Sequence, residues 1–274
     1  MYDLHTHSRI SDGTQPVTEL VADVAAAGLT GFALTDHDTT AGWAEAEQAS
    51  GRLGLDFLPG MEISCSAQGV SIHLLSYLHD PANEALLAEI NRARDSRVGR
   101  AQRMVERLAE DYPITWETVQ EQVHVGATVG RPHIADALVA LGAVANRSEA
   151  FETILTTRSK YYVPHYAMDP VRAVELVRAA GGVPVMAHPK ASARGKLASN
   201  ETIYAMIEAG LAGFEVYHRD NPEEGRTWLL ETAAKHDLLV TGSSDYHGAG
   251  KPNRLGENTT PRETVEKIRE MSRA

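Results

Sequence analysis

Cysteine is nearly absent from this chain, since Cys65 is the only one among 274 residues. A single cysteine forms no internal disulfide, which is compatible with a reducing compartment. The N-terminal residues lack the basic and then apolar stretches of a secretory signal. No run of 18 apolar residues occurs that would span a membrane. We therefore expect a soluble, cytoplasmic protein with no membrane partner.

Positive charge is also scarce, because 26 Lys and Arg stand against 37 Asp and Glu, for a formal net charge of −11. Such an acidic chain does not bind nucleic acid through a broad basic surface. A focused site, such as a cluster of metal ions, would still attract phosphate groups. The composition, with 43% hydrophobic and 23% charged residues, is that of a globular protein. The length suits one large domain or one domain with an insertion.

Short apolar segments alternate with amphipathic segments in the first and last thirds of the chain. After a first short strand near the N-terminus, strands are expected at 31–35, 55–60, 70–75, 183–187, 213–217 and 238–241, and helices at 17–27, 170–180, 203–208 and 226–236. Several of the helices end at glycine before the next strand begins. This alternation with short connections predicts an α/β fold with a mostly parallel sheet or barrel.

The middle of the chain does not follow this alternation. Residues 81–160 are predicted to be largely helical, with one continuous helix over 83–108 and almost no strand signal. We interpret residues 98–163 as a helical insertion domain, or lid. The barrel is then formed by residues 1–97 and 164–274.

Twelve histidines are present, and many of them fall at the ends of predicted strands. The pair His5 and His7 would point to one side of an extended backbone. Strand ends share one face of a parallel barrel, so distant residues can meet there. The candidate ligands are His5, His7, His37, His73, His188, His247, Asp12, Glu62 and Asp245. Imidazoles with carboxylates suit Zn²⁺, Mn²⁺ or Fe²⁺, and nine ligands suffice for two or three ions.

Taken singly, each of these residues could have an ordinary structural role. His73 could be a hydrogen-bonded histidine of the core, and Asp36 and Asp38 could cap the following helix rather than orient histidine ligands. The joint occurrence at five separate strand ends favours a metal site.

The combined motifs resemble those of the PHP (polymerase and histidinol phosphatase) superfamily. They are His5-Thr6-His7-Ser8, Ser11-Asp12-Gly13, Thr35-Asp36-His37-Asp38, Gly60-Met61-Glu62-Ile63-Ser64, His188-Pro189 and Ser244-Asp245-Tyr246-His247. The resemblance implies a distorted (β/α)7 barrel that holds three divalent ions. By that resemblance the first ion is bound by His5, His7, Glu62 and Asp245, the second by Asp12, His37 and His247, and the third by Glu62, His73 and His188.

Three further segments resemble the small bacterial phosphoesterases of this superfamily, which include nucleoside 3′,5′-bisphosphate phosphatases and 5′→3′ exoribonucleases. They are residues 130–135, 160–165 and 215–218. Substrate binding is accordingly expected of Arg131, His133, Lys160, His165 and His218, and a catalytic role of His218 and Arg131. Arg131 is suited to bind phosphate bidentately. The alternative for these residues is an ordinary surface or structural role. Lys190 departs from the family pattern, which has glycine after His188-Pro189.

We therefore expect a phosphoesterase that converts nucleoside 3′,5′-bisphosphates to 5′-monophosphates and attacks the 5′ ends of short single-stranded RNA. A hydroxide held between two ions would be the nucleophile. Manganese is the first expectation for the metal, with iron or zinc as alternatives, and the chain is expected to be a monomer. Three other functions stay open: a histidinol-phosphate or other small-molecule phosphatase, an amidohydrolase, and a metal-bound module without activity.

Overall fold

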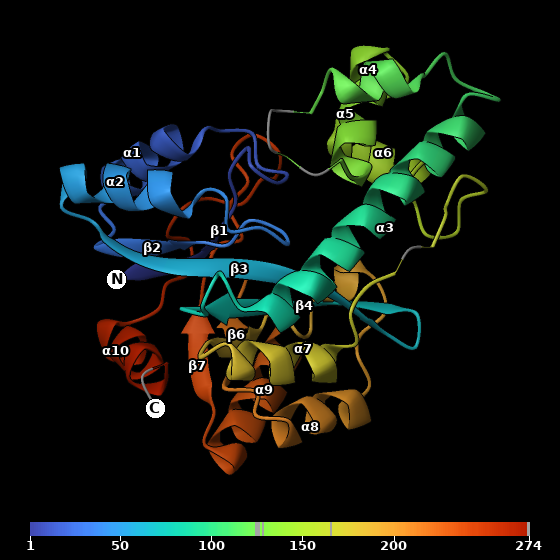
Figure 1. The fold of residues 1–274 in the computed structure, drawn as a ribbon. Coiled ribbons are helices and arrows are strands. Elements are labelled where there is room, and N and C mark those ends of the chain that lie inside the picture. The colour runs from blue at the N-terminus through green and yellow to red at the C-terminus, as the bar shows by residue number, and fades with distance from the viewer. Residues whose placement is uncertain (124–126, 128, 165, 273–274) are drawn as a thin grey trace.

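Seven strands form one sheet in the computed structural model, which describes residues 1–123, 127, 129–164 and 166–272. In spatial order, which is also chain order, they are β1 (Tyr2–Thr6), β2 (Gly31–Leu34), β3 (Asp56–Ala67), β4 (Val70–Tyr77), β5 (Val183–Met186), β6 (Gly213–Tyr217) and β7 (Leu239–Gly242). Single bridges join Thr6 to Tyr246 and Tyr2 to Thr260, so the chain after β7 lies beside β1 (Figure 1). The sheet is thus a nearly closed barrel, which confirms the predicted fold class.

β3 and β4 depart from the parallel arrangement. They form an antiparallel hairpin, and β4 is also antiparallel to β5, whereas the other neighbouring strands are parallel. The hairpin turn is Gln68-Gly69, with φ of 51° and 77°, as a type I′ turn requires. β3 also runs past Gly60, because β4 supplies backbone partners for the residues beyond it. The expectation that this strand ends at residue 60 was therefore wrong, and Glu62 lies inside the strand.

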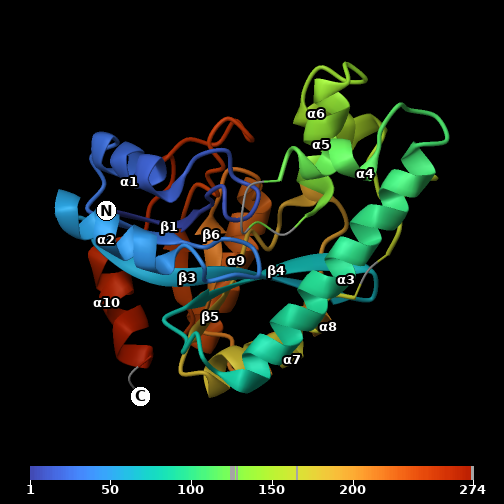
Figure 2. The same ribbon diagram turned by 45° about the horizontal axis from the view of Figure 1, so that its top comes forward.

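Six helices of the described chain pack around the barrel (Figure 2). They are α1 (Val17–Ala26), α2 (Trp43–Leu53), α7 (Pro170–Ala179), α8 (Asn200–Glu208), α9 (Glu223–His236) and α10 (Arg262–Met271), with a short 3₁₀ turn at Ser192–Arg194. The start of α7 follows from its sequence: Asp169 accepts hydrogen bonds from the N–H groups of Val171 and Arg172, and Pro170 occupies the first helical position. In the part of the chain that the structure describes, no helix has the length and apolar character to cross a bilayer.

The long helix α3 (Glu84–Leu108) connects two hydrophobic cores. Near its start Leu86 and Ile90 join the cluster between the barrel and α7, whereas Met104 and Leu108 join a second cluster. That second cluster contains residues from Ala101 to Val163 and is formed with α4 (Trp116–Gln120), α5 (Arg131–Ala140) and α6 (Arg147–Thr153). These three helices stand away from the barrel at the far end of α3 (Figure 1).

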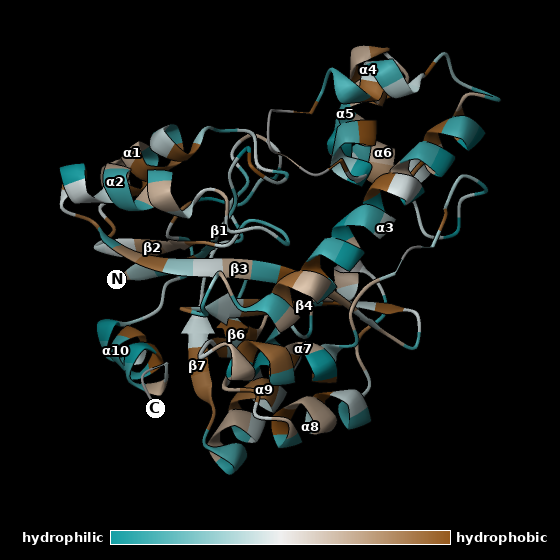
Figure 3. Ribbon diagram, viewed as in Figure 1, coloured by the Kyte–Doolittle hydropathy of each residue, from teal (hydrophilic) through white to brown (hydrophobic). Residues whose placement is uncertain are grey.

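The surface of α3 agrees with this connecting role. Most of the helix is hydrophilic, with a few hydrophobic positions where it meets each cluster (Figure 3). The division into a barrel and a helical insertion at residues 98–163 stays a prediction, and the separate apolar cluster supports it.

Candidate metal centre

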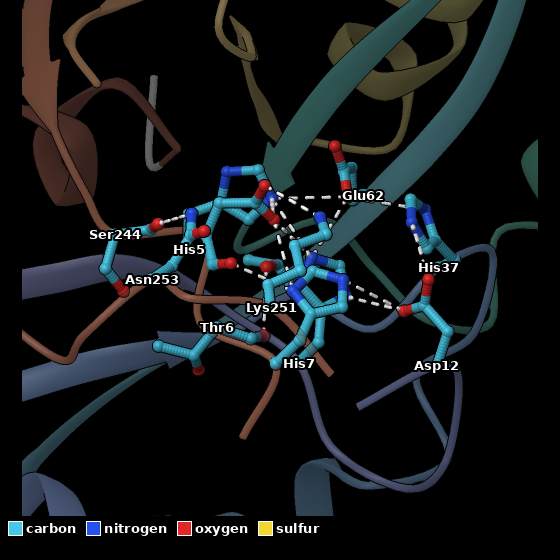
Figure 4. Close-up of polar contacts among 12 residues, drawn as sticks. His5, Thr6, His7, Asp12, His37, Glu62, Ser244, Lys251 and Asn253 are labelled. Atoms are coloured by element: carbon cyan, nitrogen blue, oxygen red, sulfur yellow. Dashed lines mark hydrogen bonds and ion pairs between the residues drawn. The ribbon is translucent and has the colours of Figure 1, made fainter. Parts of the chain in front are cut away.

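The nine candidate ligands come together at one end of the barrel. They lie in β1 (His5), the loop after it (His7, Asp12), the loop after β2 (His37), β3 (Glu62), β4 (His73), the loop after β5 (His188) and the loop after β7 (Asp245, His247). Figure 4 shows the side chains of His5, His7, Asp12, His37 and Glu62 directed toward one another. Residues about 240 positions apart in the sequence thus share one site, as the strand-end pattern predicts.

Glu62 lies at the centre of this group and is 1% exposed. Its Oε2 lies 3.2 Å from Nε2 of His5 and 3.0 Å from Nε2 of His7. Its Oε1 lies 2.7 Å from Nδ1 of His73 and 3.3 Å from Nε2 of His188. One carboxylate therefore faces imidazoles on two sides, which is the position of a bridging ligand.

Three overlapping groups of side chains have ligand atoms close enough to hold an ion. Within each group, these atoms all lie within 4.8 Å of one another. The groups are His5, His7, Glu62 and Asp245; His7, Asp12, His37 and His247; and His37, Glu62 and His73. The first group has the composition expected for the first ion. The second adds His7 to the expected set. In the third, His37 accompanies two of the three expected residues, with His188 on the same oxygen of Glu62.

The donor atoms fit divalent ions. The buried nitrogens Nδ1 of His37, Nδ1 of His73 and Nε2 of His247 have no hydrogen-bond partner in the described part of the chain. All three nevertheless lie near a carboxylate oxygen. The nitrogens of His37 and His73 are 3.3 and 2.7 Å from Glu62, and that of His247 is 3.2 Å from Asp12. Lone pairs that converge without hydrogen-bond geometry are what an ion between them requires. Metal–ligand bonds of about 2.0–2.2 Å place neighbouring donors about 3–3.5 Å apart.

Charge at the site divides the histidines into two kinds. Burial lowers the pKa of His37 to about 4 and that of His247 to about 3, so both rings are neutral and able to coordinate at pH 7. For His7, burial opposes protonation, but Asp245 and Glu62 outweigh it and raise the pKa to about 9. A proton on that ring thus balances the carboxylates, and metal binding would release it.

Buried carboxylates outside the ligand set hold the ligands in place. Glu215 in β6 accepts a hydrogen bond of 2.9 Å from Nδ1 of His5 and one of 2.8 Å from the backbone N–H of His188. Sequence reasoning assigned Glu215 no role, although a charged residue within a buried strand is a usable signal.

Asp36 accepts hydrogen bonds from Ser8 and Ser11, so it fixes the loop that carries His7 and Asp12.

Helix capping does not explain the acidic residues that flank His37. The residue before α2 is Gly42, and no side chain caps this helix. Asp38 instead accepts a hydrogen bond from the N–H of Ser64 and pairs with Arg97 of α3. Asp38, His188 and Asp245 have φ of 52°, 31° and 56°, and such strained non-glycine residues collect at functional sites.

A cavity of about 370 Å³ extends from the candidate ligands toward α3, α5 and α6. Its positively charged lining residues are Arg97, Arg100, Arg131 and Lys251, and its aromatic ones are Phe151 and Tyr162. Arg100 lies over the ring of Tyr162 and Arg131 over that of Phe151. Burial, together with repulsion from Arg131 and Arg97, lowers the pKa of Arg100 to about 10. Crowded guanidinium groups in a cavity suit an anionic ligand.

Three of the lining cations were missed by sequence reasoning: Arg97, Arg100 and Lys251. The first two belong to an arginine-rich helix, where the sequence does not distinguish the cavity face from the solvent face. Lys251 follows His247 closely, and its Nζ lies 2.9 Å from Oδ2 of Asp245 (Figure 4).

Only some of the predicted substrate-binding residues lie at the cavity. Arg131 and His133 line the cavity. Nδ1 of His133 accepts a hydrogen bond from Gly130, and Nδ1 of His218 accepts one from Asp220. Because Nδ1 is the acceptor in both rings, the N–H group is at Nε2, and Nε2 of His218 lies 3.8 Å from Oδ2 of Asp245.

Lys160 does not join the residues that line the cavity. Its side chain is 64% exposed and pairs with Asp111 at 2.6 Å. Lys160 therefore lies apart from the cavity in this structure, and its expected contact with phosphate stays a prediction. His165 lies outside the described residues.

Comparison with known proteins agrees with this geometry. The PHP domain family matches residues 3–162. Over 253 residues the chain is 34% identical to the 3′,5′-nucleoside bisphosphate phosphatase of Chromobacterium violaceum, covering 92% of this chain and 89% of that protein. It is 32% identical to a 5′-3′ exoribonuclease of Haemophilus influenzae, covering 94% and 93%. A crystal structure described as a metal-dependent phosphoesterase, from Bifidobacterium adolescentis, matches with a TM-score of 0.96 and 48% identity over 98% and 96% of the two chains.

Proposed function

This chain belongs to the PHP domain family and is a metal-dependent phosphoesterase, and we propose that it hydrolyses nucleoside 3′,5′-bisphosphates to 5′-monophosphates. The observation that carries this proposal is the cavity in which Arg97, Arg100 and Arg131 lie beside the candidate metal ligands. A bisphosphate has one phosphate for the metal end and a second for the arginines. The rings of Phe151 and Tyr162 offer apolar surface to the base.

The nine convergent side chains are the proposed ligands of three ions. Glu62 is the proposed bridge, and manganese stays the first expectation for the metal, with iron and zinc as alternatives. When bound, divalent ions lower the pKa of water and neutralise phosphoryl oxygens.

Residues of the chain then supply the remaining functions. Arg131 donates to a phosphoryl oxygen, and its guanidinium group lies over the ring of Phe151, which restricts its movement. His218 carries a proton on Nε2 and is buried beside Asp245, so we assign it the protonation of the leaving oxygen. Residues 98–163 act as a lid that limits the size of the substrate. The cytoplasmic location and the monomeric state stay predictions.

Phosphate release from the Mn²⁺-loaded protein tests this function. The panel holds 3′-phosphoadenosine 5′-phosphate, a 5′-phosphorylated oligoribonucleotide, histidinol phosphate and a cyclic phosphodiester. We expect AMP and phosphate from the first compound and loss of the activity in His188→Ala. Arg131→Ala should lower kcat/KM about tenfold or more, because a hydrogen bond to a charged group contributes roughly 1.5–3 kcal/mol.

Arg158→Ala, which removes an exposed arginine of the same insertion, is the matched control and should leave kcat/KM unchanged. Preference for the oligoribonucleotide or for histidinol phosphate would replace the proposed substrate. Release of ammonia without phosphate would indicate an amidohydrolase, and metal binding without any turnover would indicate a non-catalytic module.

A further inference from the structure

Arg147 links the helical insertion to the barrel next to the candidate metal ligands. It is the first residue of α6, and its Nε and Nη2 donate to the two carboxylate oxygens of Asp136 in α5. Its remaining nitrogen, Nη1, crosses to the barrel and donates a hydrogen bond of 2.9 Å to the backbone carbonyl of Asp12. The side chain is 18% exposed, so this contact is largely shielded from water.

The loop that carries Asp12 is joined to the loop that carries His247. The N–H of Thr14 donates to the carbonyl of His247 at 3.1 Å, and the hydroxyl of Thr14 accepts from the N–H of Ala249 at 2.8 Å. A Cβ placed on Gly250 would lie 2.6 Å from Nη1 of Arg147. One guanidinium group therefore lies against both loops.

The contact holds Asp12 without neutralising its carboxylate. Because Arg147 binds the backbone carbonyl, the side-chain oxygens of Asp12 stay directed at Nε2 of His247, at 3.2 Å, and Nε2 of His37, at 3.7 Å. Asp12 and His247 lie on loops, whereas His5, Glu62 and His73 lie in strands that the sheet itself holds. The loop ligands therefore depend most on an external support.

We infer that Arg147 is a positioning residue through which the helical insertion sets the affinity of one ion, the ion held by Asp12, His37 and His247. This inference rests on the metal site proposed above. Partners that orient metal ligands typically change metal affinity by about 10–100-fold when they are removed. Loss of Arg147 should act on this ion and spare the ion of His5, His7, Glu62 and Asp245.

A titration of the metal-free protein with Mn²⁺, followed by the paramagnetic resonance signal of the free ion, tests the inference. In Arg147→Ala we expect one class of sites to lose about 10–100-fold in affinity while the others keep theirs. Added guanidinium ion, at a concentration far below that which unfolds proteins, should restore part of the loss. Gly250→Ala keeps the arginine but displaces its head group, so it should weaken the same class.

Arg107→Ala is the matched control. Arg107 also donates through Nη1 to a backbone carbonyl, that of Tyr162 at 2.7 Å, but both groups lie within the insertion. Its Mn²⁺ isotherm should equal that of the wild type. An unchanged isotherm in Arg147→Ala would overturn the inference, and so would an equal loss of affinity in all classes of Mn²⁺ sites. Neither result would contradict the proposed metal site. Absence of Mn²⁺ binding in the wild type would overturn the proposed metal site itself.

Discussion

Glu215 illustrates how a carboxylate outside the ligand groups can still control a metal site. Its two carboxylate oxygens accept hydrogen bonds from Nδ1 of His5 and from the backbone N–H of His188. With Nδ1 of His5 hydrogen-bonded to Glu215, Nε2 is directed at Glu62, and the ring cannot rotate without losing a buried hydrogen bond. Burial would raise the pKa of Glu215, but the charges of His5, His218 and His188 outweigh it and lower the pKa to about 2.

Glu215→Gln should therefore weaken Mn²⁺ binding by about 10–100-fold while the fold is kept, because the amide has the same shape but no charge. Competition with a chelator measures the affinity, and circular dichroism checks the fold. Glu231→Gln, on the exposed face of α9, is the control. Equal affinities in the two variants would show that Glu215 does not support the ligands.

α3 is the element that joins the two hydrophobic cores. Its first half is packed on the barrel and its second half on α4, α5 and α6, so it transmits the position of the insertion to the cavity. Arg97, in between, donates to Asp38 and Ser64 beside the metal ligands. The helix therefore determines where the insertion lies relative to the site.

Met104 is fully buried in the second cluster, so Met104→Ala should destabilise the insertion by about 2–5 kcal/mol, the usual cost of such a truncation. We expect limited proteolysis to cut residues 98–163 faster, with the barrel cut later. Leu87→Ala, on the exposed side of the same helix, should change neither rate. Simultaneous cleavage of both parts in Met104→Ala would mean that the two cores unfold together.

α10 is attached to the barrel through a polar contact as well as through Val265 and Ile268. Arg269 donates to Asp56 at 2.6 Å, and the hydroxyl of Tyr2 donates to the other carboxylate oxygen at 2.8 Å. Partial burial raises the pKa of Asp56, but the two hydrogen bonds and the charge of Arg269 outweigh it, so the pKa is lowered. The folded state therefore favours the ionised form.

Asp56→Asn should accordingly lose up to about 1 kcal/mol of stability at neutral pH, the range for a partly exposed ion pair. A lowered pKa stabilises the fold above the unfolded-state value of about 3.9, and this contribution disappears as the pH falls through the folded-state value. Urea unfolding at a series of pH values should show the two proteins converging below about pH 4. A constant difference across that range would exclude the ion pair as its cause.

The whole molecule has an uneven distribution of charge. Its formal net charge is −11, yet four cationic side chains line one cavity next to the candidate metal ligands. An anionic substrate would therefore be attracted by this cavity and not by the overall charge of the protein. Bound ions would add to it and would also stabilise the fold, since the ligands come from six strands or the loops after them and assemble only when the barrel is closed.

Removal of the metal by a chelator should lower the melting temperature. A ligand present at 100 times its Kd stabilises the folded state by about 2.7 kcal/mol, which corresponds to about 5–10 °C for a chain of this size. Differential scanning calorimetry with and without the chelator measures the shift. In Glu62→Gln the chelator should have a much smaller effect. An equal shift in both proteins would place the stabilising ion elsewhere.

Local patterns were sufficient for the class of the fold and for the chemistry of the candidate site. Hydrophobic periodicity and glycine punctuation predicted the alternating strands and helices, because both reflect neighbouring residues. The motifs around His5 and His7, and around Asp245 and His247, predicted a cluster of histidines and carboxylates, and the structure brings these side chains together. The topology of a barrel then requires strand ends to meet.

Only the tertiary structure decided which side chains of equal chemistry face the site. Arg97 and Arg100 line the cavity, whereas Arg107 binds carbonyls of the insertion and Lys160 pairs with Asp111. The direction of a side chain depends on how the whole helix is rotated against its neighbours, which residues remote in the sequence determine. The extension of β3 through Glu62 and the reach of Arg147 to Asp12 likewise arise from partners far along the chain.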